Sequence, residues 1–220
     1  NERLGNIMKI TLKDGSVKEY AQAMSVIDIA NDISEGLGRA ACAGEVNGEV
    51  VDLRTVIEED CELSILTFND EAGKAAYRHT CSHVLAEAVK RLYPEAKLAI
   101  GPSIDTGYYY DFEHEPFSRE DLDKIEAEMK KVIKENAKIE RFTMPREEAI
   151  KFMEEKGEPY KVELIRDLPE DAVISFYSQG DFVDLCAGPH LMKTGAIKAF
   201  KLISSSGAYW RGKSENQKLY

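Results

Sequence analysis

Cysteine and histidine are scarce in this chain of 220 residues, which has four of each. The cysteines, at positions 42, 61, 81 and 186, show no close pairing, which excludes a dense disulfide framework and favours a reducing compartment. No apolar run approaches the ~20 residues that a membrane-spanning helix needs. Residues 1–9 do not resemble a signal peptide. We therefore expect a cytoplasmic protein with no membrane partner.

The charge is strongly negative overall, at −11, but unevenly distributed. Residues 186–220 contain six Lys and Arg against one acidic residue, and four aromatic residues lie among them. Such a mixture can stack bases and contact the backbone of single-stranded RNA ends. The same composition also fits an edge sheet with solvated lysines, and composition alone does not separate these two interpretations.

The first part of the chain carries the turn signals of a small β-rich domain. Alternating apolar residues predict strands over 7–12 and 17–20, joined at Asp14-Gly15. After Ser25, apolar spacing predicts a short helix that ends at Gly36. Asn47-Gly48 predicts a second hairpin between 43–46 and 50–53, and 63–67 a last strand. This order of elements is typical of a β-grasp fold.

A polar, glycine-containing stretch at residues 69–73 places the domain junction, giving domains 1–67 and 68–220. In the second domain we predict helices over 71–93, from Ser118 with Asp121 as a capping box, and over 145–157. Predicted strands cover residues 108–112, 162–165, 173–177, 182–185 and 196–203. The second domain is therefore predicted to be α+β, with helices packed on a largely antiparallel sheet.

Three of the four histidines lie in two short motifs, His79-Thr80-Cys81-Ser82-His83 and Cys186-Ala187-Gly188-Pro189-His190. On a helix, His79 and His83 project from one face, roughly 160 to 200° from the apolar stripe that includes Cys81 and Leu92. They should therefore face solvent or a cleft. The Gly188-Pro189 step makes the second motif a loop after a strand.

These motifs belong to a larger resemblance. Five ordered blocks of this chain resemble bacterial threonyl-tRNA synthetases, at residues 78–83, 100–102 with 107–111, 160–162, 183–190 and 207–212. The resemblance implies a TGS domain of β-grasp fold followed by an editing domain, as the amino-terminal fragment of such an enzyme. It also implies an aminoacyl-tRNA deacylase that removes serine wrongly attached to threonine tRNA.

The resemblance also sets expectations for cofactors and partners. We expect no cofactor in this fragment; the parent enzyme, a threonine–tRNA ligase, would use Mg-ATP and a zinc in its missing aminoacylation core. The expected partner is the acceptor end of threonine tRNA carrying serine, and the parent would form a homodimer through the missing core. Editing is needed because a pocket distinguishes one methyl group only about 10 to 200-fold.

Site roles follow as hypotheses. His79 is predicted to be the general base on water, and Lys161 to stabilise the developing oxyanion. His83 and His190 would orient water and the ribose. Substrate-binding roles are predicted for Asp184, which would bind the ammonium of serine, and for Tyr110, the Gly101 backbone and Cys186, which would line the pocket.

Other interpretations remain open at this point. His79, His83, Cys186 and His190 could instead hold a tetrahedral zinc, either for hydrolysis or as the structural centre of a non-catalytic RNA-binding or regulatory module. Cys186 could also be a nucleophile with a histidine as its base. His114, between two glutamates, is predicted to be a solvated loop residue without a role.

Overall fold

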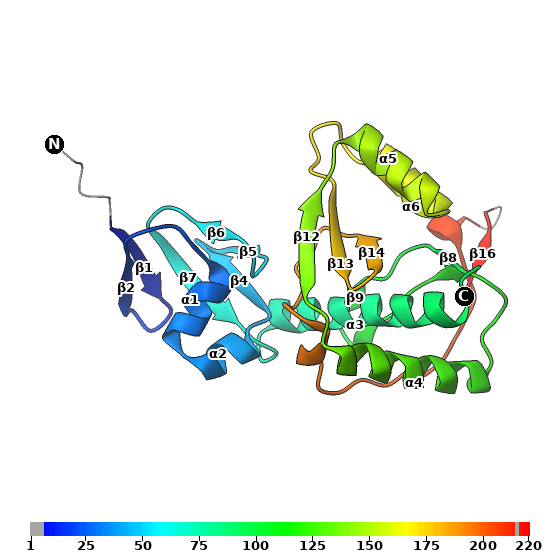
Figure 1. The fold of residues 1–220 in the computed structure, drawn as a ribbon, viewed down its shortest axis with the longest axis horizontal. Coiled ribbons are helices and arrows are strands. Elements are labelled where there is room, and N and C mark those ends of the chain that lie inside the picture. The colour runs from blue at the N-terminus through cyan, green and yellow to red at the C-terminus, as the bar shows by residue number, and fades with distance from the viewer. Residues whose placement is uncertain (1–6, 214–215) are drawn as a thin grey trace. The chain divides into compact units, whose positions relative to one another are not determined.

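The computed structural model describes residues 7–213 and 216–220 (Figure 1). Contacts divide the chain into two compact units. The first consists of Asn1–Tyr77 with Gly188–Met192, and the second of Arg78–Ala187 with Lys193–Tyr220. The division falls within helix α3 (Glu71–Leu92).

The first unit contains a five-stranded sheet with the order β2-β1-β7-β4-β5. β1 and β7 pair in parallel and the other neighbours are antiparallel. The bounds are β1 Met8–Leu12, β2 Val17–Tyr20, β4 Ala43–Val46, β5 Glu49–Val51 and β7 Cys61–Leu66, with a small pair of β3 Met24–Ser25 and β6 Val56–Ile57. Both predicted hairpins are present, and Asn47 and Gly48 have the positive φ angles, 50° and 86°, that the tight turn requires.

The helical part of this unit differs from the prediction in one respect. Instead of one helix ending at Gly36, α1 (Val26–Ile33) and α2 (Glu35–Ala40) are separated by Ser34. Ser34 adopts an extended conformation, and its side chain accepts the Leu37 N–H as the N-cap of α2. The apolar side of α1 packs on the sheet in a core of buried side chains that includes Ile10, Val26, Ile29, Leu53 and Leu63.

The second unit is α+β, as predicted. Its main sheet is antiparallel with the order β12-β13-β14, formed by Ile139–Thr143, Ser175–Gln179 and Phe182–Leu185. Its other helices are α4 Arg119–Glu135, α5 Arg146–Glu155 and α6 Pro159–Asp167, with 3-10 turns at Thr194–Ala196 and Trp210–Gly212. Three two-stranded pairs complete it: β8 Lys97–Leu98 with β11 Phe112–Glu113, β9 Ser103–Ile104 with β10 Gly107–Tyr108, and β15 Ala208–Tyr209 with β16 Lys218–Leu219.

Three strand predictions in this unit were wrong. The predicted strand over 162–165 is part of α6, which begins with Pro159 at a position that favours helix initiation. Three apolar residues among four do not by themselves distinguish a strand from a buried helical turn. Residues 196–203 form no strand, and Ile203 is 82% exposed. Residues 108–112 are divided between β10 and β11, which pair with different partners.

Two burial predictions also needed correction. Helix α3 is not buried on one stripe alone: residues 80–89 are all buried, whereas Leu92 is exposed. His114 lies in a loop but is not simply solvated, because its ring stacks on Phe117 with centroids 4.7 Å apart and its Nε2 lies 3.4 Å from Glu95.

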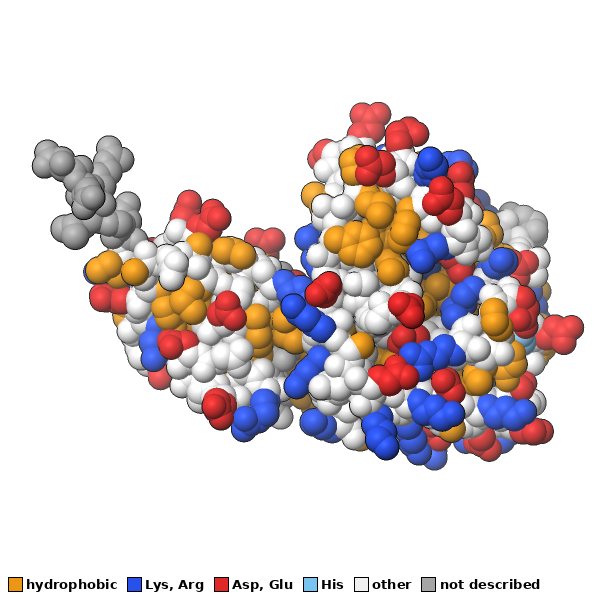
Figure 2. Space-filling view, in the orientation of Figure 1, with side chains coloured by type: hydrophobic (Ala, Val, Ile, Leu, Met, Phe, Trp, Pro, Cys, Tyr) orange, Lys and Arg blue, Asp and Glu red, His pale blue; other side chains and the backbone are white. Residues whose placement is uncertain are grey.

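On the face drawn in Figure 2, basic side chains alternate with acidic ones and form no continuous basic field.

The capping box predicted at Ser118 is present, with reciprocal bonds between Ser118 and Asp121 at the start of α4. Loss of such a cap costs about 1 kcal/mol. We expect Ser118→Ala to lower the free energy of unfolding by that amount in urea denaturation. Ser204→Ala, at an exposed position outside helices and strands, should change it by less than about 0.5 kcal/mol. Equal losses in both variants would contradict a capping role.

Candidate active site

A pocket of about 400 Å³ opens in the second unit. Its walls come from α3, from the loop that follows β8, from α6 and from the end of β14. The lining side chains and backbone include seven of the predicted site residues, namely His79, His83, Gly101, Tyr110, Lys161, Asp184 and Cys186. These residues come from positions as far as 107 apart in sequence, so tertiary folding alone brings them together.

A buried ion pair lies in this pocket. The carboxylate of Asp184, on β14, is 3.0 Å from Lys161 Nζ through Oδ1, and both side chains are almost completely buried. The hydroxyl of Tyr110 donates to Asp184 Oδ2 at 2.6 Å. Burial alone would raise the pKa of Asp184, but Lys161, His83 and the Tyr110 hydrogen bond outweigh it and hold the pKa below its usual value. The carboxylate therefore stays ionised.

Lys161 is held on more than one side. It lies in the first turn of α6, and its ammonium is 5.2 Å from the centre of the Tyr110 ring. A buried ammonium is stable only when it is paired. Asp184 supplies that pairing, so the pocket contains a fixed positive group.

The two histidines of α3 face this ion pair. Their rings meet edge to face with centroids 5.3 Å apart, and His83 Nε2 lies 3.7 Å from Asp184 Oδ2. Burial lowers the pKa of both imidazoles, that of His83 to about 3. Both rings are therefore neutral near pH 7, and His83 is the weaker proton acceptor of the two. The sequence predicted that His79 and His83 face solvent or a cleft, and in the structure both line the pocket.

Cys186 lies next to His79, with Sγ 3.3 Å from His79 Nε2. Its backbone is fixed by Ser175, whose hydroxyl donates to the Cys186 carbonyl at 2.5 Å and whose carbonyl accepts the Cys186 N–H at 3.0 Å. Ser175 was not expected from the sequence, because its partner Cys186 lies 11 residues away, directly after strand β14.

Gly101 is positioned by Ser82, which the sequence analysis also missed although it precedes His83 in the same motif. The Ser82 hydroxyl lies 2.7 Å from the Gly101 carbonyl oxygen and 2.7 Å from that of His79. Gly101 packs directly against an aromatic ring: a Cβ there would lie 2.1 Å from Tyr110 Cδ2. A side chain at this position is therefore incompatible with the observed place of Tyr110.

His190 belongs to the first unit with the segment Gly188–Met192. Its N–H donates to Asp52 Oδ2 at 3.0 Å, and Arg54 donates to the carbonyls of His190 and Leu191 at 3.1 and 2.6 Å. Asp52 and Arg54 were not singled out from the sequence. The role assigned to the His190 side chain stays a prediction.

The donor atoms of His79, His83 and Cys186 lie within 4.8 Å of one another. Imidazole and thiolate are the ligands that zinc prefers, and 3.3 Å between the sulfur and a ring nitrogen is compatible with two ligands of one tetrahedral ion. These residues could therefore hold zinc through two nitrogens and one sulfur.

The basic carboxyl-terminal segment is partly used within the second unit. Trp210 is buried against Tyr160, and its indole N–H donates to Glu163 of α6 at 2.8 Å. Arg211 pairs with Glu163 and Asp167. Trp210 is thus a packing residue, whereas Tyr209 remains 43% exposed.

Comparisons with known proteins match both parts of the chain. Residues 8–67 match the TGS domain, and residues 174–220 match the threonyl and alanyl tRNA synthetase second additional domain. A protein named threonine–tRNA ligase from Acetivibrio thermocellus is 68% identical over 97% of this chain. One from Clostridium botulinum strain Hall is 62% identical over the same share.

The chain therefore combines a TGS domain of β-grasp fold with a second additional domain of the threonyl and alanyl tRNA synthetase type. Together with the identity to threonine–tRNA ligases, this confirms the resemblance to threonyl-tRNA synthetases seen in the sequence. It spans about a third of the length of these relatives, 34% in both. Among the described residues, no helix is long and apolar enough to cross a membrane.

Substitution of Gly101 tests the contact with Tyr110. Gly101→Ala should displace the ring and weaken its bond to Asp184, which should lower the free energy of unfolding by about 1 to 3 kcal/mol, as overpacking does. Urea denaturation measures this change. Gly107→Ala is the matched control, because a Cβ there meets nothing within 4 Å. Similar effects at both glycines would contradict the close packing.

Neutral burial of His83 predicts a pH dependence of stability. Between pH 6.5 and about 3, the unfolded histidine binds a proton and the folded one does not, so stability is lost as the pH falls through this window. His79, Lys161 and Asp184 all face this ring. After chelator dialysis, the free energy of unfolding is measured as a function of pH between about 3 and 6.5. His83→Gln should reduce the slope of that free energy against pH by about 1.4 kcal/mol per pH unit. An unchanged slope would contradict neutral burial.

Proposed function

We propose that this chain hydrolyses the ester bond of serine wrongly attached to threonine tRNA. The observation that carries the proposal is the pocket in which neutral His79 lies together with the Lys161 ammonium, itself fixed by Asp184. Hydrolysis of an ester needs a proton acceptor for water and a positive group for the oxyanion. The likeness of the chain to threonyl-tRNA synthetases supports an aminoacyl-tRNA substrate.

In the proposed reaction, His79 removes a proton from water as the water oxygen attacks the ester carbonyl. Lys161 stabilises the oxyanion of the tetrahedral intermediate. The carbon–oxygen bond to the ribose then breaks, and the ribose oxygen takes the proton back from His79. The products are free serine and uncharged tRNA, and His83 orients water or the ribose within the pocket.

We assign Asp184 to holding Lys161. Its two oxygens already contact Lys161 and Tyr110, and its side chain is almost fully buried. A bond to the substrate ammonium, as predicted from the sequence, would have to replace one of these partners. Gly101 and Tyr110 are proposed to shape the wall that admits serine and excludes the extra methyl group of threonine.

The partners of the whole enzyme are part of the same proposal. The acceptor end of threonine tRNA would enter this pocket, and the complete protein would charge that tRNA and dimerise through parts outside this chain. The three donors of His79, His83 and Cys186 support a second candidate, a non-catalytic RNA-binding module with a structural zinc.

One experiment separates these candidates. The chain, dialysed against a chelator, is mixed with seryl-tRNA and with threonyl-tRNA, both on threonine tRNA. We expect serine to be released and threonine to be retained. Serine release only after zinc is added would favour a zinc-dependent site, and no release under either condition, with bound stoichiometric zinc, would favour the binding module.

The residue roles are tested by substitution. His79→Ala and Lys161→Ala should each lower the single-turnover rate of serine release by about 10²-fold or more, because each removes a group that acts in the transition state. Lys151→Ala, at an exposed position on α5, is the control and should keep the wild-type rate. Unchanged rates in both site variants would refute the assignment.

A further inference from the structure

Glu158, directly before α6, is a buried carboxylate that the mechanism above does not use. It stands at the N-cap position, where short side chains such as Asp or Ser usually accept an N–H of the helix, and it makes no such bond. Instead, its Oε2 accepts the Leu98 N–H at 2.8 Å and its Oε1 lies 3.0 Å from Lys90 Nζ. The carboxylate therefore binds the helix start to other parts of the unit.

Lys90 is the partner of this carboxylate on α3, two helical turns after His83. Besides Glu158, its ammonium donates to the carbonyls of Pro94 and Ala96 at 3.0 and 2.8 Å. An ammonium has three donor hydrogens, and these acceptors match all of them. The pair is consequently fixed in both position and direction.

The contacts of this pair reach the chain segments that carry the site. Lys90 lies on the helix of His79 and His83. Leu98 is in β8, from which the chain leads to the pocket wall at Gly101. Glu158 precedes Lys161 by less than one helical turn. Since a misplacement of about 1 Å at a reacting group can cost about 10²-fold in rate, such a connection matters for catalysis.

We propose that Lys90 and Glu158 are positioning residues, which set the place of Lys161 relative to His79 by fastening the start of α6 to α3 and β8. The inference deepens the proposed hydrolysis and rests on it for its kinetic readout. Neither residue lines the pocket, so they act through Lys161 and do not contact the substrate.

The test uses a double replacement. Removing one partner leaves a buried unpaired charge and destabilises strongly, whereas apolar replacement of both is often neutral. The full chain with Lys90→Met and Glu158→Leu should remain folded, with a lower melting temperature because the Leu98 N–H and the carbonyls of Pro94 and Ala96 lose these bonds. Its kcat for seryl-tRNA should fall about tenfold or more with KM unchanged. A crystal structure should show the contact between Lys161 Nζ and Asp184 Oδ1 lengthened from 3.0 Å.

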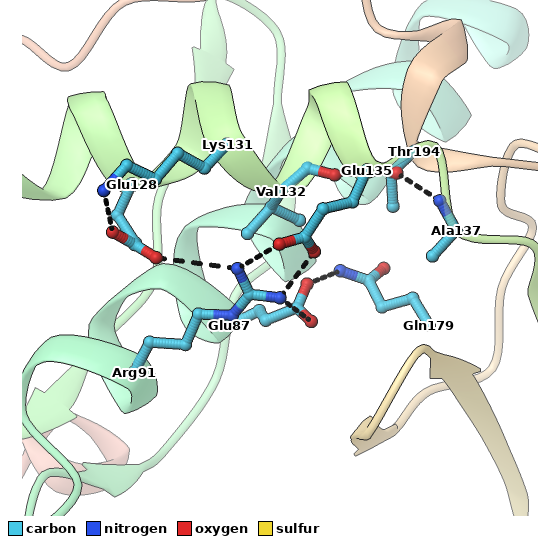
Figure 3. Close-up of polar contacts among 9 residues, drawn as sticks. All are labelled: Glu87, Arg91, Glu128, Lys131, Val132, Glu135, Ala137, Gln179 and Thr194. Atoms are coloured by element: carbon cyan, nitrogen blue, oxygen red, sulfur yellow. Dashed lines mark hydrogen bonds and ion pairs between the residues drawn. The ribbon is translucent and has the colours of Figure 1, made fainter.

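A neighbouring ion pair on the same helix supplies the control. Arg91 of α3 contacts Glu135 of α4 at 2.6 Å, and it also faces Glu87 and Glu128 (Figure 3). Arg91→Met with Glu135→Leu should also lower the melting temperature, because the buried Glu87 loses its cation whereas Glu128 keeps Lys131, but should leave kcat unchanged. If Lys90 and Glu158 only stabilised the fold, their double variant would likewise have a lower melting temperature and an unchanged kcat.

Wild-type kcat in the Lys90 and Glu158 double variant would overturn the inference. So would a lower kcat with the contact between Lys161 and Asp184 intact, because Lys161 would then still be in place. If the wild-type chain releases no serine, the proposed function fails, and the length of that contact in the double variant alone decides the positioning role. Should the double variant not fold, Glu158→Gln, which keeps an acceptor for Leu98, is judged by the same readouts.

Discussion

The ion pair between Lys161 and Asp184 is the constraint on which the candidate site depends. Removing one partner of a buried pair typically costs about 3 to 5 kcal/mol, because the other charge remains without compensation. Removing Asp184 would also leave the hydroxyl of Tyr110, a buried donor, without this acceptor. Helix α6 and strand β14 must therefore keep their relative place for the pocket to remain stable, and this requirement fixes a cation beside the histidines.

Local chemistry explains why much of the fold was predictable. Asn47-Gly48 can adopt the positive φ angles of a tight hairpin, and Ser118 with Asp121 begins a helix with side-chain bonds three residues apart. Such signals act within a few residues. Prediction failed where neighbouring residues do not determine the secondary structure, as at residues 162–165. Their three apolar side chains fit a strand or a helix equally well, and in the structure they lie in α6, where Val162 and Ile165 pack against α5 and the sheet.

The same distinction applies to the site. Its motifs located His79, His83 and Cys186, and the family resemblance added Lys161, Tyr110 and Gly101. The sequence could not give the partner of Asp184, because Tyr110 is 74 residues away and the lysine comes from another element. Ser82 and Glu158 were missed for a similar reason: serine and glutamate are common, and only their partners distinguish them.

Burial also separates the two histidines as candidate bases. A pKa of about 3 makes His83 a poor proton acceptor near neutral pH, because a general base works best when its pKa is close to the operating pH. His79 is less buried and contacts Cys186 at the end of β14. Its pKa is also lowered by burial, but Asp184 opposes that effect more strongly than Lys161 adds to it. The difference in burial therefore supports the proposal that His79 is the base and that His83 is a neutral group that orients the water.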